Sequence, residues 1–392
     1  MIPKTTDVLI VGAGPTGLAL SIGLTQAGVN HIIVDKLEQG LNTSRAGVIH
    51  AQTLESLSTL GVAERLTELG LMLDKFAIRD RDRALLQLRF DRLPSAHPYL
   101  LMLPQNVTEA VLADRILELG GKVHRGVTAK AMVQDAESVR VTLDDNGTDR
   151  TISARYVVGA DGMHSVVREA TGIGFEGGAY DGSFVLADVH LDWPLGDEVS
   201  LFFSPAGLVV VAPLPDGSFR VVATMDEAPE KPTTADIQAW IDGRGPTESG
   251  AKVRDVVWSS RFRLHHRIAD SYRKGRLVLM GDAAHVHSPA GGQGMNTGLV
   301  DAVVLGHVLT DVVKGKRPED ALDLYETLRR PAALQVLELA GRMTGMATMR
   351  SPLKRFVRNA VMSLVNLNPL AKRRIAMALS GLSRAALARL PD

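Results

Sequence analysis

Gly281-Asp282-Ala283-Ala284-His285, followed by Ser288-Pro289-Ala290-Gly291-Gly292-Gln293-Gly294-Met295-Asn296-Thr297-Gly298, is the stretch that decides the fold of this chain. The apolar run Arg276–Met280 precedes it, and an apolar segment with helical character follows it. This pattern predicts a strand that ends at an acidic residue, then a loop of small residues, then a helix. Because such a loop directs backbone N–H groups one way and the helix N-terminus adds positive potential, we expect the stretch to accept an anionic ligand.

A second nucleotide-binding pattern lies near the start of the chain. The apolar run Asp7–Val11 stops at Gly12-Ala13-Gly14-Pro15-Thr16-Gly17, a helical pattern ends near Gly28, and residues 31–34 form another apolar run that ends at Asp35. In this strand–turn–helix–strand unit, the first glycine permits a tight turn and the second lets a pyrophosphate approach the backbone. The third glycine lets helix and strand pack closely, and the acid is placed to accept from ribose hydroxyls.

These two loops are more than 250 residues apart in the sequence, so a ligand that contacts both must be long, which favours FAD over NAD alone. A mostly β pattern over residues 175–263 separates them, so the nucleotide-binding domain must be discontinuous. The predicted class is α/β (α+β overall), with a Rossmann-like FAD-binding domain, an inserted and mostly antiparallel β-sheet domain, and a C-terminal helical segment. The predicted bounds are 1–72 with 97–172 and 270–345 for the first, 73–96 with 173–269 for the second, and 346–392 for the third.

The composition excludes several classes of function. The formal net charge of +0 argues against a nucleic-acid-binding protein, because such domains usually carry a basic excess. The absence of cysteine excludes disulfides, thiolate nucleophiles, iron–sulfur sites and a cysteinyl flavin link, and it fits a cytoplasmic location. The first residues lack the pattern of a secretory signal. His285 and His287 stand two apart, but no third ligand of suitable spacing is near, so we predict no metal site.

A third motif, Val158-Gly159-Ala160-Asp161-Gly162-Met163-His164-Ser165-Val166-Val167-Arg168, completes a set. The three motifs together resemble those of the group A flavoprotein monooxygenases, the p-hydroxybenzoate-hydroxylase-like family, over residues 5 to 345. The resemblance implies non-covalent FAD, NADPH or NADH as co-substrate, O2, and a small aromatic substrate. It implies that the FAD-binding domain has three layers and that the inserted sheet, which covers the flavin, is the substrate domain. It also implies hydride transfer to the flavin, followed by hydroxylation of the substrate through a flavin C4a-hydroperoxide.

The resemblance assigns cofactor contacts to residues in each motif. The glycines of the first motif would hold the pyrophosphate, Asp35 the adenosine ribose, and Asp282 the ribityl hydroxyls. The implied FAD-binding residues are Gly12, Gly14, Pro15, Thr16, Gly17, Asp35, Lys36, Arg45, Gln105, Asp161, Gly162, Gly281, Asp282, Pro289, Gly292, Gln293, Gly294, Met295 and Asn296. Arg45 and Gln105 have simpler alternatives, a surface arginine and a helix N-terminus. Asp35 replaces the family's usual glutamate, and His164 stands where arginine is common.

The substrate-binding positions depart from those of the small-benzoate hydroxylases. The aligned segments, Leu201–Phe203 and Ala212–Leu214, are apolar, which favours a hydrophobic or polycyclic phenol. Arg220 aligns with an arginine that influences flavin movement, or is a sheet-surface arginine. His190 is a candidate base. Alternatives are a monooxygenase that inactivates a polycyclic antibiotic, a different flavoenzyme such as a halogenase or a geranylgeranyl-type reductase, and a non-catalytic flavoprotein binding module.

The last segment, residues 349–392, holds nine basic residues and one acidic residue, a net charge of +8. Leu353, Phe356, Val357, Val361 and Leu364 have helical spacing. We expect this apolar stripe to pack on the chain's own domain; the alternative is a peripheral membrane or protein contact. The chain is expected to be a monomer or a homodimer.

Overall fold

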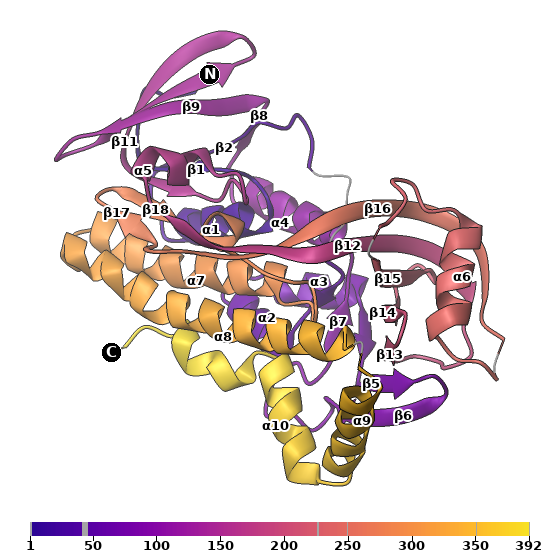
Figure 1. The fold of residues 1–392 in the computed structure, drawn as a ribbon. Helices are drawn as coiled ribbons and strands as arrows, with labels where there is room; N and C mark the ends of the chain where they lie inside the picture. Colours follow the sequence, from indigo (N-terminus) through magenta and orange to yellow (C-terminus); the bar gives the residue numbers. More distant parts are fainter. Residues whose placement is uncertain (1, 41–45, 226, 249, 350, 392) are drawn as a thin grey trace.

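The computed structural model describes residues 2–40, 46–225, 227–248, 250–349 and 351–391. Two large sheets dominate the structure, and long helices of the C-terminal third pack beside them (Figure 1). The structure confirms the predicted fold class, since a nucleotide-type parallel sheet with helices is joined to a mostly antiparallel sheet.

The first sheet is parallel at its centre, with strand order β17-β18-β11-β1-β2-β8. Strands β9 and β10 extend it as an antiparallel meander with β11. Its strands are β1 (Thr5–Val11), β2 (His31–Asp35), β8 (Val123–Arg125), β9 (Val127–Gln134), β10 (Val139–Asp145), β11 (Thr148–Gly159), β17 (Arg273–Lys274) and β18 (Leu277–Leu279). Because β1, β11 and β18 come from distant parts of the chain, all three predicted motifs follow neighbouring strands of one sheet.

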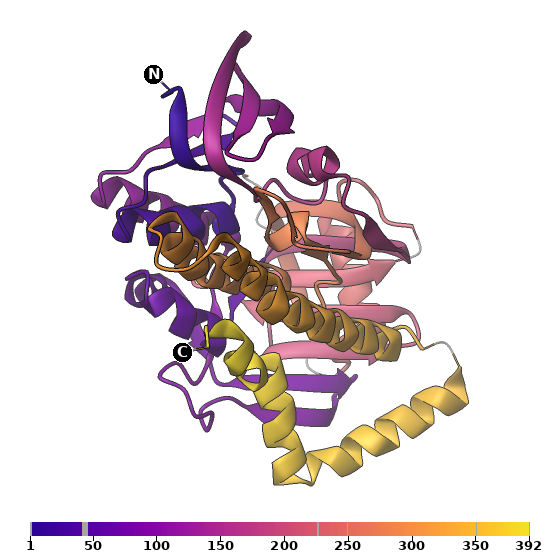
Figure 2. The same cartoon turned by 90° about the vertical axis from the view of Figure 1, so that its left-hand side faces the viewer.

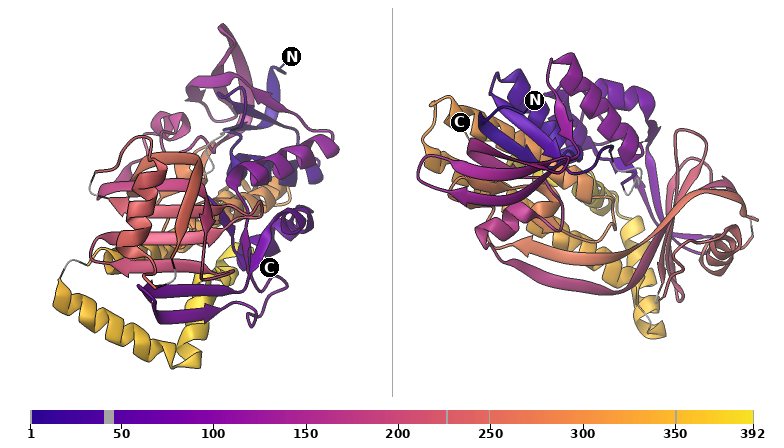
Figure 3. Two further views of the ribbon diagram at one scale, coloured as in Figure 1. Left: turned by 90° about the vertical axis from the view of Figure 1, so that its right-hand side faces the viewer. Right: turned by 90° about the horizontal axis from the view of Figure 1, so that it is seen from above.

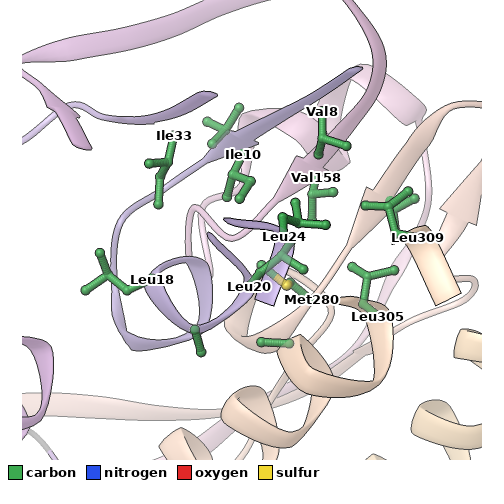
Figure 4. Close-up of a cluster of buried hydrophobic side chains, with 14 of the residues drawn as sticks. Val8, Ile10, Leu18, Leu20, Leu24, Ile33, Val158, Met280, Leu305 and Leu309 are labelled. Carbon is green, nitrogen blue, oxygen red and sulfur yellow. The ribbon is translucent and has the colours of Figure 1, made fainter. Parts of the chain in front are cut away.

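Helices cover this sheet and supply its core. Apolar side chains of β1, β2 and β11 pack against α1 (Pro15–Gln26) and α7 (Gly294–Val313), as Figure 4 shows. The remaining helices near this sheet are α2 (Ala51–Ser58), α3 (Ala63–Leu69), α4 (Gln105–Glu118), α5 (Val166–Thr171) and α8 (Asp323–Ala347), with 3-10 turns η1 (Gly281–Ala283) and η2 (Glu319–Leu322). Within the described ranges, α7 is the one helix long and apolar enough to cross a membrane, and its burial is that of a core helix.

The second sheet has the order β19-β16-β12-β15-β14-β13-β5-β6, and only its β13–β5 pair is parallel. Its long strands β12 and β16 run from the first sheet to the outer part of the second (Figure 3). The strands are β5 (Lys75–Asp80), β6 (Arg83–Arg89), β12 (Phe175–Asp192), β13 (Val199–Ser204), β14 (Gly207–Pro213), β15 (Phe219–Met225), β16 (Lys252–Ala269) and β19 (His285–Val286), with α6 (Thr234–Arg244) packed on them. A small sheet that the sequence did not predict joins β3 (Val48–Ile49), β7 (Leu100–Met102) and β4 (Leu71–Leu73).

The chain ends in α9 (Pro352–Asn366), α10 (Pro369–Leu379) and the 3-10 turn η3 (Leu382–Ala388), which lie at the periphery (Figure 2). Met362 and Leu379 are buried, but the large apolar residues of the predicted stripe are 51% to 72% exposed. The expectation that this stripe packs on the chain's own domain is therefore wrong for α9. The reason is that α9 contacts the second sheet through its opposite face, which is mixed and includes Arg358, Asn359 and Met362.

A buried charge network fixes the turn η1 between the two large sheets. Asp301 on α7 accepts from Arg329 Nε at 2.7 Å and from His285 Nε2 at 2.6 Å, and the backbone N–H of Gly281 donates to it at 3.2 Å. Burial alone would raise the pKa of Asp301, but His285 and Arg329 lower it, so the carboxylate stays ionised. The network joins α7, α8 and the strand end that carries Asp282.

We predict that Arg329→Leu destabilises the protein by about 3–5 kcal/mol, because it leaves the Asp301 carboxylate buried without its main cation. Arg342→Leu is the matched control, since it makes the same change on the same helix, where Arg342 pairs with Glu338 and is 73% exposed. This control should cost about 0–1 kcal/mol. Urea unfolding of both variants measures the difference, and similar losses in the two would contradict a special role for the buried pair.

Candidate active site

One cavity of about 870 Å³ lies where the two large sheets meet. The loop after β1, the segment after β11 and the loop between η1 and α7 all line it. The structure therefore brings the three predicted motifs to a single site. Its volume is at the upper end of the range for small-molecule and cofactor sites.

The loop after β1 has the shape of a phosphate cradle. Gly12 has φ +104°, and a Cβ there would lie 2.3 Å from the Ala160 carbonyl oxygen, so only glycine fits. A Cβ on Gly14 would meet nothing within 4 Å, so this residue faces open space at the N-terminus of α1. Pro15 follows as the first helical residue, and no side chain caps the helix. An anion can therefore occupy this helix N-terminus, as the FAD pyrophosphate requires.

Close packing joins this loop to the loop that begins at Gly281. A Cβ on Gly281 would lie 2.9 Å from Thr16 Oγ1, and one on Gly298 would lie 2.4 Å from the same atom. Gly17 is equally restricted, since its Cβ would lie 2.0 Å from the Gly12 carbonyl oxygen. Thr16 lines the cavity, whereas Gly17 and Gly281 lie behind it and set the shape of its wall.

Two residues predicted to contact FAD line the cavity from β2 and α4: Asp35, for the adenosine ribose, and Gln105, for the chain of the cofactor. Asp35 accepts from the Ala13 N–H at 2.6 Å and from the Leu37 N–H at 2.8 Å, so it stabilises the loop as well as facing the cavity with Lys36. Gln105 also lines the cavity; its amide donates to Glu109 at 2.8 Å and its carbonyl oxygen accepts from the Ala46 N–H. Arg45 lies outside the described residues.

The motif after β11 contributes Asp161 and Gly162 to the cavity wall. Asp161 Oδ2 accepts from the N–H groups of Val166 and Val167, which begin α5. Its Oδ1 is buried without a hydrogen-bond partner in the described part of the chain, and burial raises the pKa of this carboxyl group. A Cβ on Gly162 would meet nothing within 4 Å. A cofactor hydroxyl that donates to Asp161 would satisfy this atom, so the segment fits the bound group.

The loop before α7 lines the cavity through Pro289, Gly292, Gly294 and Met295, and Asp282 lines it from η1. Gln293 and Asn296 play a different part, because their side chains fix the loop. Asn296 Oδ1 accepts from the His50 N–H at 2.8 Å, and its amide donates to the carbonyls of Val48 and Gly292.

The Gln293 side chain ties the same loop to the C-terminal segment. Its amide donates to the Leu379 carbonyl at 2.8 Å, and its carbonyl oxygen accepts from Arg384 at 2.9 Å. The loop itself lines the cavity at Gly291, Gly292 and Gly294, residues without side chains, so a flat ring can approach the backbone closely there.

The other half of the cavity is apolar. Strands β5, β12, β13, β14, β15 and β16 supply most of its wall, and α8 and α10 close it from the side. Its lining side chains include Phe76, Phe90, Phe184, Leu201, Phe203, Leu208, Val210, Ala212, Phe262, Met343 and Leu379. A flat hydrophobic molecule fits this wall better than a small carboxylate does.

The two predicted catalytic residues are placed differently. Arg220 lines the cavity and is buried; it forms a bidentate pair with Asp188 at 2.8 Å and donates to the Ala46 carbonyl at 2.6 Å. It thus connects the second sheet to the segment that leads into β3. His190 is 51% exposed, pairs with Asp255 at 2.9 Å on the outer surface, and does not line the cavity. The structure therefore brings Arg220, but not His190, to the site.

Two buried histidines lie in or against the loop between η1 and α7, which we call the flavin loop. Neither was predicted as a site residue. His50 donates from Nε2 to the Gly291 carbonyl at 2.8 Å, and His287 donates from Nδ1 to the Ser288 carbonyl at 2.9 Å. Burial lowers the pKa of each to about 4, against a usual value of 6.5. Both are therefore neutral at pH 7. A histidine that follows a short strand, as His50 does, gives no sequence signal of this role.

The comparisons with known proteins agree with this geometry. Residues 5–340 match the FAD binding domain family. The chain is 36% identical to the 6-methylpretetramide 4-monooxygenase of Streptomyces rimosus, over 96% of this chain and 69% of that protein. It is 36% identical to the pentachlorophenol 4-monooxygenase of Sphingobium chlorophenolicum, over 84% of this chain and 63% of that protein. The chain thus spans about two thirds of the length of these relatives.

A solved structure, the OxyS anhydrotetracycline hydroxylase from Streptomyces rimosus, superimposes with a TM-score of 0.82 at 33% identity. The alignment covers 96% of this chain and 76% of that one. The chain belongs to the FAD-binding family of flavin-dependent aromatic monooxygenases, and FAD is its cofactor.

We predict that Gly14→Ala weakens FAD binding by about 10- to 100-fold and leaves the unfolding free energy of the apoprotein within about 0.5 kcal/mol. At Gly14 the backbone has φ −73°, which alanine adopts freely, and the added methyl would occupy the space of the pyrophosphate. Fluorescence titration with FAD and urea unfolding measure the two effects.

Gly17→Ala is the matched comparison, because its methyl would meet the Gly12 carbonyl instead of the cofactor. This variant should lose stability. Equal FAD affinity in Gly14→Ala and the unmodified protein would refute the assignment of Gly14 to the phosphate cradle.

The buried histidines predict a pH dependence of stability. Their folded pKa of about 4 lies below the unfolded value of 6.5, so between these limits the unfolded chain binds more protons. The unfolding free energy should therefore fall as the pH falls from about 6.5 to about 4. The slope should decrease by about 1.4 kcal/mol per pH unit in His50→Gln, which keeps a donor for Gly291. Urea unfolding at several pH values in saturating FAD tests this, and an unchanged slope would contradict it.

Proposed function

We propose that this chain hydroxylates a hydrophobic phenol of polycyclic size, using O2 and NADPH or NADH. The observation that carries the proposal is the single cavity, with nucleotide-binding loops at one end and an apolar wall at the other. The relatives named for 6-methylpretetramide and for anhydrotetracycline support a polycyclic substrate. A relative named for pentachlorophenol supports the phenol class in general.

FAD, when bound, would supply the redox chemistry that links the nicotinamide nucleotide to O2. The chain's own residues bind the cofactor, orient the substrate and exclude water. The loops at Gly14 and Gly292 would hold the cofactor, and Asp161 and Asp282 would accept hydrogen bonds from its hydroxyl groups. The apolar side chains of the second sheet hold the substrate and exclude water from the reacting atoms.

Arg220 has a positioning role in this proposal. Its bidentate pair with Asp188 and its bond to the Ala46 carbonyl place the segment before β3 against the cavity. No proton transfer is assigned to His190, because its contact with Asp255 lies on the outer surface. Substrate ionisation in solution, or an already acidic phenol, would make an enzymatic base at that position unnecessary.

The experiment compares anhydrotetracycline with phenol as stimulators of NADPH and NADH oxidation by the FAD-loaded protein. We expect stimulation by the polycyclic compound and a product that is heavier by one oxygen atom. Oxidation that no phenol stimulates would favour a non-catalytic flavoprotein. A product that has lost its antibacterial effect would favour antibiotic inactivation.

A smaller cavity should slow turnover of the polycyclic substrate much more than turnover of phenol. Val210 on β14 faces the apolar half, so Val210→Trp should lower kcat/KM for a polycyclic substrate by about 10- to 100-fold, while phenol turnover changes by less than about threefold. Val257→Trp on β16 is the control, because Val257 is 55% exposed and lies outside the cavity lining. Parallel losses for both substrates in Val210→Trp would contradict binding of the polycycle to this wall.

A further inference from the structure

Helix α9 shows its apolar side to solvent. Leu353, Phe356, Val357, Val361 and Leu364 are 51% to 72% exposed and recur at helical spacing along one face. The stripe continues over the corner to α10, where Leu367 is 78% and Leu370 is 71% exposed. Contiguous exposed apolar surface of this kind is uncommon on a soluble protein and marks an interaction surface.

The opposite side of α9 is bound to the protein by polar contacts. Asn359 donates to Asp80 at 2.7 Å, Asn366 accepts from the Gln87 N–H at 2.9 Å, and Ser363 accepts from Arg83 at 3.1 Å. Arg358 donates to the Met346 carbonyl at 2.6 Å and lies over the Phe203 ring. These contacts fix the rotation of the helix about its axis. The outward direction of the stripe is therefore built into the fold.

Charge around the stripe has one sign. Lys354, Arg373 and Arg374 are exposed beside it, and the sequence holds no aspartate or glutamate from residue 349 to residue 391. A second copy of this chain would bring the same basic segment and no acidic residue of that segment to pair with it. An anionic lipid surface offers both an apolar interior for the stripe and negative headgroups for the flanking cations.

We propose that α9 and the α9–α10 corner bind the surface of an anionic lipid bilayer. The helix lies parallel to the surface with Leu353, Phe356, Val357, Val361 and Leu364 in the acyl boundary. Lys354, Arg373 and Arg374 meet the headgroups. The protein is held peripherally and does not span the bilayer.

The test is sedimentation of the FAD-loaded protein with vesicles of equal parts phosphatidylglycerol and phosphatidylcholine, with flavin absorbance followed in the pellet. We expect binding to these vesicles, weaker binding at high salt, and much weaker binding to vesicles of phosphatidylcholine alone. Phe356→Ser with Leu364→Ser should lower the partition coefficient at least about tenfold. Lys354→Gln, Arg373→Gln and Arg374→Gln should each lower it about fivefold.

Leu117→Ser with Val133→Ser is the matched control, because these side chains are 64% and 62% exposed on other elements. This double variant should bind vesicles as the unmodified protein does, and flavin content and NAD(P)H oxidation report that all variants are folded. Vesicle binding that survives Phe356→Ser with Leu364→Ser, or equal binding to neutral and anionic vesicles, would overturn the proposal. The proposal would also be overturned if the protein formed a dimer in lipid-free solution and Phe356→Ser with Leu364→Ser dissociated that dimer, because the face would then bind a second copy.

Discussion

The site depends on the close approach of three backbone segments that are far apart in the sequence. Gly12 lies against the Ala160 carbonyl, and Thr16 fits between Gly281 and Gly298 in the space that side chains would fill. Each contact is shorter than a Cβ would allow, so glycine is required by geometry at these points. Because the three segments follow β1, β11 and β18 of one parallel sheet, their approach places all of them on the same cavity. At Gly14 and Gly162, by contrast, an added Cβ would meet nothing within 4 Å, and both residues line the cavity.

The buried charge at Asp301 supports this arrangement from behind. A carboxylate with no exposure is costly unless it is paired, and here it is paired with Arg329, His285 and the Gly281 N–H. These partners belong to α8, β19 and η1, so the charge cannot be satisfied unless these three elements are correctly placed. Burying the Asp301 carboxylate is unfavourable by itself, but its pairing fixes the position of the turn that carries Asp282.

The sequence predicts those parts of the structure that follow from local pattern. The glycine loops, the acid at Asp35, the inserted β region and the apolar character of Leu201–Phe203 all rest on spacing or periodicity, and the structure gives them their expected surroundings. Gln293 and Asn296 are different: their side chains are buried in contacts with residues more than 80 positions away, such as His50 and Arg384. A motif shows that such residues matter, but not whether they contact ligand or hold the loop.

A local sequence pattern is also not sufficient to place His190 relative to the cavity or to orient the apolar stripe of α9. His190 alternates in step with Phe184 and Leu186 of β12, which line the cavity, so the strand pattern gives its face correctly. It lies near the end of β12, however, past the cavity lining, where it is exposed and pairs with Asp255. Helical spacing in α9 likewise predicts an apolar stripe without predicting its direction. The direction follows from contacts with the β5–β6 hairpin, where Asn359, Ser363 and Asn366 bind Asp80, Arg83 and the Gln87 N–H. Met362 on the same side of α9 is buried in the apolar cluster of the second sheet.

The C-terminal segment is part of the site as well as of the surface. Leu379 of α10 lines the apolar half of the cavity, and Arg384 binds Gln293 beside the flavin loop. Burial lowers the pKa of Arg384 to about 10, but the guanidinium stays charged at pH 7 and donates to two groups, the Gln293 side chain and the Ala378 carbonyl. Since Gln293 also binds the Leu379 carbonyl, the flavin loop and α10 share one hydrogen-bonded unit. Helix α10 thus connects the outward face of α9 to the flavin loop.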